Sequence, residues 1–384
     1  MQNFLFAICL SLIIPTAVAA QVASRPMKFE PQQAQTMGTS PTALTAKADV
    51  AIHDRSRAAG PPQVQIANGV LTAGVYLPDP DQGFYRGTRF DWSGVFSGLQ
   101  YEHHEFYGKW FQRAVPSVHD FQFDGPQIVV GAASAITGPV EEFTTNNHAL
   151  GFDEARPGQH FVKIGVGVLL KPDSAPYDRF RAYKIIDHGK RTIKTSANSV
   201  EFTQEINDRS SGYGYIYRKT VTLTPGKPQM VLTHSLRNIG AKPITTEVYD
   251  HNFLILDHQP TGPDFTIYAT YLIKPTTPPP AGLMEVNANE VRYLKTLANE
   301  EDLIMDMSGF GPGADNYDFR VENKHVGVGV RFAGDRPLTR ATVWSIRTAI
   351  GVEPEISMDI KPGEQFEWTI TYDYYTVPVK LSSE

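Results

Sequence analysis

The chain has 384 residues, of which 41% are hydrophobic and 20% charged, and its formal net charge is −6 at pH 7. Its charges are spread along the sequence without a basic stripe or a long block of one sign, which excludes a typical nucleic-acid-binding protein. The single cysteine, Cys9, lies among the first twenty residues, so disulfides, a thiol nucleophile and a cysteine metal site are excluded from the rest of the chain.

The N-terminal residues have the pattern of an export signal. Residues 4–14 are mostly apolar, Pro15 follows them, and Val18-Ala19-Ala20 offers the small residues of a cleavage site. The apolar run is too short for a stable membrane anchor. We therefore predict a signal peptide over residues 1–20, a periplasmic or secreted protein, and no membrane partner after cleavage. Residues 21–63 are rich in Ala, Gln, Thr, Ser and Pro, which predicts a flexible leader.

Residues 64–384 are predicted to form one all-β domain. Short β-branched and aromatic runs alternate there with clusters of Pro, Gly, Asn and Asp. Residues 221–224 and 229–236 flank the turn Pro225-Gly226-Lys227-Pro228, which predicts a hairpin, and a second hairpin turn is predicted at 238–241. Over residues 287–297 the apolar spacing fits a helix, and a strand fits it nearly as well.

Three segments combine β-branched residues with glycines and charged residues, namely 162–168, 325–332 and 344–353. Because strand side chains alternate between faces, each segment predicts one apolar face and one face that glycines leave open. The charged residues on the open faces are Lys163, His325, Arg331, Arg347 and Glu353. Close packing of a second sheet explains the glycines equally well. We favour a groove for a sugar or an anion, because these charged side chains are costly to bury without partners.

His251 and Glu353 stand out because an imidazole and a carboxylate on either side of a small ligand can give a proton to one end of it and remove one from the other. His251 follows the strand-like residues 244–250, and Glu353 closes an apolar run before Pro354. Structural roles are also open, since His251 could be a hydrogen-bonded core residue and Glu353 could simply end a strand. Asp250 is adjacent to His251 and is predicted to face the other way.

Residues 221–253 resemble a motif of the galactose mutarotase-like (aldose 1-epimerase) superfamily. The run has two paired strands, an Asn-containing turn and a further strand that ends in a His near an aromatic residue. The C-terminal part is also similar, with an apolar strand leading to Glu353, then Pro362-Gly363-Glu364 and a last strand over 366–375. The resemblance covers about residues 64–379. It implies a large antiparallel supersandwich with a concave sugar-binding face.

The resemblance also implies catalytic roles. His251 would be the acid on the ring oxygen of a hexose and Glu353 the base on the anomeric hydroxyl, without a metal or cofactor. A sugar-binding arginine of the family would correspond to Arg89 or to Arg86, although salt bridges to Asp91 or Glu102 are an alternative for both.

Further positions are implied by the same resemblance or limited by spacing. His148 precedes a Gly-Phe-Asp sequence as a second His does in the family, and an additional Asp could be Asp315 or Asp257. The cluster His103-His104-Glu105 lacks a third ligand at fixed spacing, so no metal site is predicted. Four aromatic residues could form either core or a sugar-stacking wall: Phe106, Tyr107, Trp110 and Phe111.

The function predicted from these features is that of an exported carbohydrate epimerase or mutarotase acting on a mono- or oligosaccharide. The alternative is a non-catalytic carbohydrate-binding protein, or a protein related to polysaccharide lyases or hydrolases, because one fold hosts several chemistries.

Overall fold

The computed structural model describes residues 60–379. The predicted signal peptide and all but the last four residues of the predicted leader lie outside this range, so the export prediction stays a prediction. Strands dominate the described residues, which confirms the all-β class. Within residues 60–379, no helix has the length and apolar character needed to cross a membrane.

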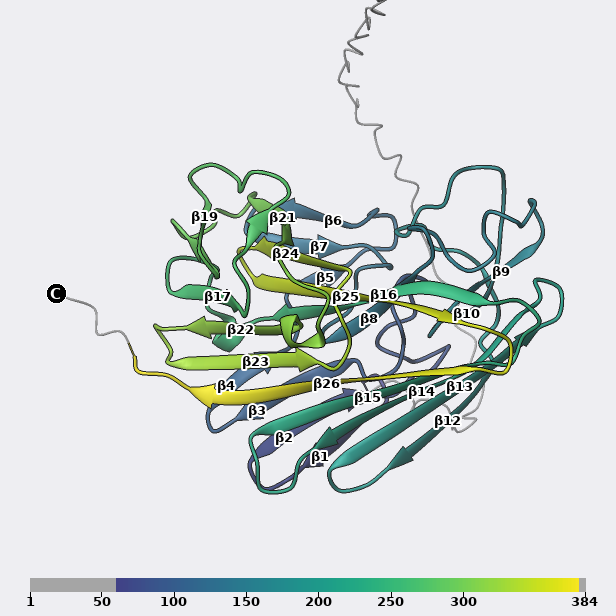
Figure 1. The fold of residues 1–384 in the computed structure, drawn as a ribbon, viewed down its shortest axis with the longest axis horizontal. Helices are drawn as coiled ribbons and strands as arrows, with labels where there is room; N and C mark the ends of the chain where they lie inside the picture. Colours follow the sequence, from purple (N-terminus) through teal and green to yellow (C-terminus); the bar gives the residue numbers. More distant parts are fainter. Residues whose placement is uncertain (1–59, 380–384) are drawn as a thin grey trace, which may run out of the picture. The chain divides into compact units, whose positions relative to one another are not determined.

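Ten antiparallel strands form the largest sheet, in the order β12-β13-β14-β15-β26-β23-β22-β17-β20-β19 (Figure 1). The C-terminal strand β26 lies at its centre, between β15 and β23. In sheet order the strands are β12 (Lys190–Thr195), β13 (Ser199–Asp208), β14 (Tyr213–Leu223), β15 (Gln229–Asn238), β26 (Gln365–Thr376), β23 (Val328–Gly334), β22 (Asp318–Asn323), β17 (Phe265–Ala269), β20 (Glu290–Tyr293) and β19 (Met284–Asn287).

A second antiparallel sheet has six strands in the order β18-β21-β24-β25-β16-β8. These are β18 (Lys274–Pro275), β21 (Asp302–Ser308), β24 (Arg340–Ile346), β25 (Ala349–Ile360), β16 (Ile244–Leu254) and β8 (Val140–Thr144). Two large antiparallel sheets of this kind are what the sequence resemblance implied.

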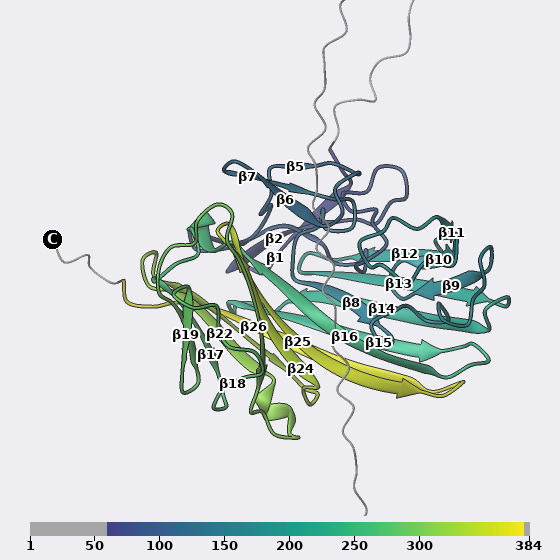
Figure 2. The same ribbon diagram turned by 90° about the horizontal axis from the view of Figure 1, so that it is seen from above.

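Three small sheets and two 3₁₀ turns complete the fold. One sheet contains β1 (Gln63–Ala67), β2 (Leu71–Tyr76), β3 (Phe96–Tyr101) and β4 (His104–Tyr107). Another contains β5 (Arg113–Ala114), β6 (Phe121–Asp124) and β7 (Gln127–Val130), which lie together in Figure 2. The third contains β9 (His160–Lys163), β10 (Gly167–Leu170) and β11 (Ile185–Asp187), and the 3₁₀ turns are η1 (Leu256–His258) and η2 (Ala314–Asn316).

The main core lies between the six-stranded and ten-stranded sheets. Phe143 of β8 packs against Tyr217 of β14 and Trp368 of β26, and Asp250 of β16 accepts a hydrogen bond from Tyr372 of β26. One face of the six-stranded sheet is therefore covered by the ten-stranded sheet. Its opposite face is available to form a site.

The predicted hairpin turns have different outcomes. Strands β14 and β15 pair antiparallel around the Pro225–Pro228 turn, which confirms the first hairpin. The turn at 238–241 instead connects β15 to β16, which belong to different sheets, so the second hairpin prediction is wrong. Residues 287–297 are not helical, because Ala288 adopts a φ of 57° and turns the chain between β19 and β20.

The three glycine-containing segments are not the uninterrupted strands that the sequence predicted. A turn at Gly165 (φ 79°) separates β9 from β10, residues 324–327 form a turn before β23, and Arg347-Thr348 connects β24 to β25. The connection at 347–348 makes Trp344 face the same side as Gly351, whereas an uninterrupted strand over 344–353 would place the apolar Trp344 and the glycine on opposite faces.

The open space predicted beside the glycines is filled by the protein itself. A Cβ on Gly165 would lie 2.6 Å from Asp91, and one on Gly329 would meet the ring of Tyr375 at the same distance. Close packing, which was the alternative to a ligand groove, therefore explains both of these glycines.

Candidate functional site

The site lies on the outer face of the six-stranded sheet. Residues two apart on a strand share a face, so β16 presents Tyr249, His251 and Phe253 there, while β25 presents Gly351 and Glu353. The register pairs Phe253 with Gly351, which places the two sets side by side. Tyr249, His251, Phe253 and Glu353 line a cavity of about 280 Å³, and its other walls come from the neighbouring strands β24 and β21 and from loops.

Pro354 interrupts the pairing of β16 with β25 beside His251 and Glu353. The paired residues on one side are Tyr249 and Glu355, and on the other side Asn252 and Val352. Between them, Pro354 has no N–H group to donate to the ladder. Glu353 therefore does not end a strand, since β25 continues to Ile360.

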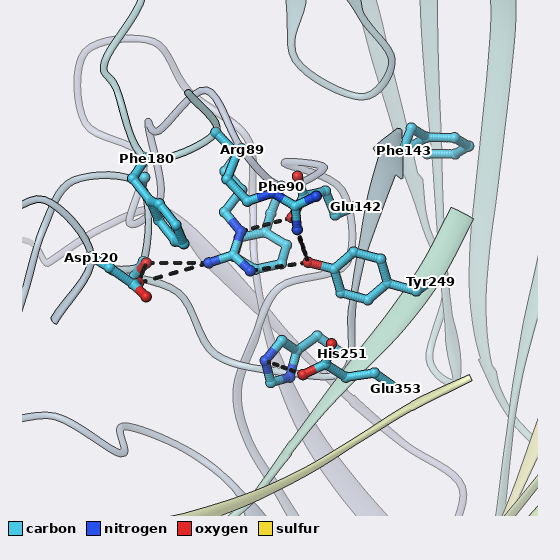
Figure 3. Close-up of polar contacts among 12 residues, drawn as sticks. Arg89, Phe90, Asp120, Glu142, Phe143, Phe180, Tyr249, His251 and Glu353 are labelled. Atoms are coloured by element: carbon cyan, nitrogen blue, oxygen red, sulfur yellow. Dashed lines mark hydrogen bonds and ion pairs between the residues drawn. The ribbon is translucent and has the colours of Figure 1, made fainter. Parts of the chain in front are cut away.

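His251 and Glu353 are in direct contact, with 3.1 Å between Nε2 and Oε1 (Figure 3). The sequence-based hypothesis placed them on either side of a ligand, and this distance leaves no space for a sugar ring between them. They instead form a pair at the cavity floor. His251 is buried, and Glu353 is 16% exposed toward the cavity.

The surroundings of the pair shift both pKa values away from their ordinary ranges. Burial lowers the pKa of His251 well below its usual value, and the charge of Arg89 adds to this effect. Burial raises the pKa of Glu353 to about 7, although nearby arginines oppose the shift. The pair therefore shares one proton, mainly on Glu353, below about pH 7, and it loses this proton as the pH rises through that value.

Aromatic contacts fix the His251 ring. It stacks on Phe253 with 3.5 Å between ring centroids, and Phe90 and Trp344 meet it edge-on. Its Nδ1 is buried and has no hydrogen-bond partner among the described residues. Only Nε2 therefore has a proton partner, and that partner is Glu353.

Gly351 provides the space that His251 occupies. A Cβ at this position would lie 2.7 Å from Cε1 of His251 and 3.2 Å from the ring of Trp344. We predict that Gly351→Ala displaces the imidazole, lowers the unfolding free energy by about 1–3 kcal/mol and reduces any activity that depends on His251. Urea denaturation would measure the first effect. Gly311→Ala is the control, because its Cβ would meet only Asn316 at 3.9 Å; equal effects of the two substitutions would contradict the prediction.

A buried group of charges adjoins the pair, and we call it the Glu142 cluster. It consists of Arg89, Glu142, Lys163, Arg179 and Tyr249. Glu142 accepts hydrogen bonds from Arg89 Nε at 2.7 Å, Lys163 Nζ at 3.2 Å and Arg179 Nη1 at 3.5 Å, and also from the Tyr249 hydroxyl. Burial alone would raise the pKa of Glu142, but the three cations lower it strongly, so the carboxylate is ionised.

Arg89 connects the Glu142 cluster to the cavity. Figure 3 shows its guanidinium between Asp120 on one side and Glu142 with Tyr249 on the other. It also lies over the rings of Phe90 and Phe180. Arg89 was the first arginine that the resemblance implied, and the structure places it in the cavity wall with His251 and Glu353.

Three other predicted binding residues do not line this cavity. Arg86 is exposed and donates to the carbonyl of Asp81. His148 is held by Asp153 at 2.8 Å, and its neighbour Asn147 lines the cavity in its place. Lys163 is buried beneath the wall, where it donates to Glu142 and to the carbonyl of Phe143 at 2.7 Å.

The remaining predicted residues lie elsewhere because the segments that carry them turn. His325 is in the exposed turn before β23, and Arg331 pairs with Asp318 and Asp373 on the ten-stranded sheet. Arg347 donates to the carbonyl of Leu297 at 2.8 Å and lines a separate cavity with Lys109 and His258. None of the three faces the His251–Glu353 pair, so their predicted role at this site is corrected.

The two aspartates considered for the additional family position also lie outside the cavity. Asp257 binds the His104 ring at 2.7 Å and the Glu105 amide at 2.7 Å, and Asp315 belongs to η2. Asp120 and Asp302 are the aspartates that line the cavity. No group of three or more side chains suited to a metal ion occurs within residues 60–379.

Several residues of the cavity and of the Glu142 cluster beside it were not recognised from the sequence. Tyr249 carried a usable signal, because it is two residues before His251 and must share its strand face. Glu142 carried a weaker one, as the second of two adjacent acidic residues in an otherwise apolar strand. No local sequence signal pointed to Arg179, Phe180 or Arg340, because their place in the cavity depends on how distant segments pack.

The fold and site together define an all-β protein with a buried imidazole–carboxyl pair on the outer face of one sheet. No protein-family model matches the chain, and no curated protein matches it. Solved structures that are similar include several described as galactose mutarotase-like proteins or aldose 1-epimerases. This is the same superfamily that the sequence motifs resemble.

Three of these structures illustrate the similarity. The galactose mutarotase related enzyme from Lactobacillus acidophilus shares 12% identity over 83% of this chain and 100% of its own, with a TM-score of 0.46. A galactose mutarotase-like protein from Clostridium acetobutylicum shares 9% identity over 82% of this chain and 95% of its own, with a TM-score of 0.48. An aldose epimerase homologue from C. elegans shares 12% identity over 82% of this chain and 99% of its own, with a TM-score of 0.44.

Proposed function

We propose that this protein interconverts the anomers of a sugar, with His251 and Glu353 exchanging protons with the hemiacetal. The observation that carries the proposal is the 3.1 Å contact between the two groups at the floor of a cavity. A pair that holds one proton near pH 7 has both a donor and an acceptor ready, which is the requirement for general acid–base catalysis.

The spacing of the pair suits the two oxygens of a hemiacetal. The ring oxygen and the anomeric hydroxyl are bonded to the same carbon, so the groups that serve them must be adjacent. Protonated Glu353 donates to the ring oxygen while His251 Nε2 takes the hydroxyl proton, and the ring C–O bond breaks. The open-chain aldehyde rotates about its C1–C2 bond. Ring closure then reverses both transfers and restores the pair.

Each residue thus acts once as an acid and once as a base in a full cycle. The resemblance implied fixed roles, with His251 as the acid and Glu353 as the base. Those roles need an imidazolium beside a carboxylate, which has the same proton count as a neutral imidazole beside a carboxylic acid. Both descriptions belong to one protonation state of the pair. No metal or cofactor enters the proton balance of this cycle.

The cavity walls suit a single sugar ring. Trp110, Phe121 and Trp344 offer aromatic surface, and Asn147, Asp302 and Thr342 offer polar groups. This mixture of apolar wall and a few polar groups is typical of small-molecule sites. A volume of about 280 Å³ favours one monosaccharide unit over a long chain, which favours the epimerase over the polysaccharide-binding alternative.

The test is the rate of anomer interconversion, measured by polarimetry or exchange NMR on freshly dissolved single anomers. We predict that kcat/KM is highest below about pH 7 and falls above it, because the free protein loses the shared proton as Glu353 ionises. It falls again only in acid, well below the usual range of histidine, where His251 becomes charged. Activity that rises through pH 7 after subtraction of the uncatalysed rate would show that the active form lacks this proton.

A further inference from the structure

The Glu142 cluster carries more positive than negative charge. Arg89, Lys163 and Arg179 share the single carboxylate of Glu142. The carboxylate of Asp120 lies 3.8 Å from Arg89 and compensates its charge in part, but the closer partner of Asp120 is the Ser134 hydroxyl. Buried charges without counterions are costly. The wall of the cavity therefore attracts a negative group.

Arg179 is the member of the cluster with donors to spare. Its two hydrogen bonds, to Glu142 and to the Tyr249 hydroxyl, both come from Nη1 and are both 3.5 Å long. Arg89, in contrast, uses Nε at 2.7 Å and Nη2 at 3.0 Å. A guanidinium has five N–H donors. Within the described residues, Nε and Nη2 of Arg179 have no protein acceptor, and its side chain is 26% exposed at the cavity wall.

The remaining charged groups of the cavity limit the charge of the ligand. Arg340 is bound by Asp306 at 2.9 Å and is not available to a ligand in the same way. Asp302 and Glu355 line the cavity and would repel an anion, although burial raises the pKa of Glu355 and so weakens its charge. One spare arginine in a cavity that two such acidic residues also line matches a singly charged carboxylate better than a doubly charged phosphate.

Tyr249 adjoins both Arg179 and the His251–Glu353 pair. Its hydroxyl is 3.5 Å from Arg179, and its ring centroid is 6.3 Å from that of His251. Arg179 and His251 therefore border the same tyrosine and line the same cavity, so one small sugar can contact both. A carboxylate at C5 of a pyranose ring is attached beside the ring oxygen, so it can reach Arg179 while the anomeric centre meets His251 and Glu353.

We infer that the substrate is a sugar acid of the hexuronate type, whose carboxylate pairs with the spare donors of Arg179. The anomeric chemistry in this inference rests on the proposed function, whereas the recognition of the carboxylate does not.

The experiment compares the full protein on glucuronate and on glucose, which differ at C6 only. We expect kcat/KM to be about ten- to hundredfold higher for glucuronate, the range of a charge-assisted hydrogen bond. Arg179→Gln is expected to reduce the glucuronate-to-glucose ratio by about the same factor, and Arg179→Lys to keep part of it. Arg292→Gln, which removes an exposed arginine outside the cavity, is the matched control and should leave the ratio unchanged.

Calorimetric titration with glucuronate separates the two proposals. Turnover of both sugars with no preference for glucuronate, and no effect of Arg179→Gln on the ratio, would overturn the sugar acid and leave the proposed function intact. Absence of turnover together with glucuronate binding that Arg179→Gln weakens would support the sugar acid and overturn the proposed function. If the protein neither turned over the two sugars nor bound glucuronate, both proposals would be overturned.

Discussion

Glu353→Gln is expected to lower kcat/KM for anomer interconversion by about 10²–10⁴-fold, the usual contribution of a general acid–base group. The amide keeps the shape of the carboxyl but cannot exchange a proton with the ring oxygen or with His251 Nε2, its 3.1 Å neighbour. His251→Gln should cause a loss of similar size, because the two residues act as one unit and their effects are not additive. Polarimetry on the best substrate would measure both variants.

The same Glu353→Gln variant is expected to be more stable than the parent protein in alkaline solution. The pKa of Glu353 is about 7 in the folded protein and about 4.3 in an unfolded chain. The native state therefore binds more protons between these values, and its stability falls as pH rises through this window. Glutamine removes the cost of ionisation, so the unfolding free energy should be about 1–3 kcal/mol higher than that of the parent protein at pH 8. At pH 5 the difference should be much smaller.

Urea denaturation at pH 5 and pH 8 would test this difference. Glu285→Gln, at an exposed position of β19, is the control and should change neither activity nor its pH dependence. A purely structural role for Glu353 predicts the reverse result, with stability lost at both pH values and activity reduced only in proportion to unfolding.

The fold class and the strand face of His251 were accessible from the sequence for physical reasons. Alternating apolar residues and Pro- or Gly-rich turns specify strands locally, as they do for β14 and β15. His251 lies on the long strand β16, so its strand face could be inferred from its neighbours. The apposition of His251 with Glu353, about a hundred residues away, came from the family resemblance and not from periodicity.

Two of the predictions that failed, those for Arg347 and His325, share one cause, which is chain reversal that the pattern did not reveal. Arg347 was assigned to a strand face, but it lies in the two-residue connection between β24 and β25. His325 was likewise placed in a strand and occupies a turn. A reversal changes which face each later residue presents, so one missed turn misplaces a whole set. Arg179 lay beyond any local rule, because its role depends on Glu142, 37 residues earlier in the chain.

The largest effect on stability is expected from Glu142→Gln. The carboxylate is fully buried and is the shared acceptor of Arg89, Lys163 and Arg179. The substitution keeps the side-chain volume but leaves three cations near one another without a counterion. Removing one partner of a buried ionic group typically costs about 3–5 kcal/mol. Urea denaturation at pH 7 should show a loss of this size, whereas Glu154→Gln, at the exposed pair with Lys242, should cost less than about 1 kcal/mol.

A second substitution distinguishes charge repulsion from loss of packing. Lys163→Met removes one of the three cations while keeping an unbranched side chain of similar length. In the Glu142→Gln background it should restore part of the lost stability, whereas alone it should be destabilising, because Glu142 then loses a 3.2 Å partner. The two changes should therefore couple by about 0.5–3 kcal/mol. Strictly additive losses would mean that Glu142 stabilises the protein through shape and not as the counterion of the cluster that holds Arg89 and Arg179 at the cavity.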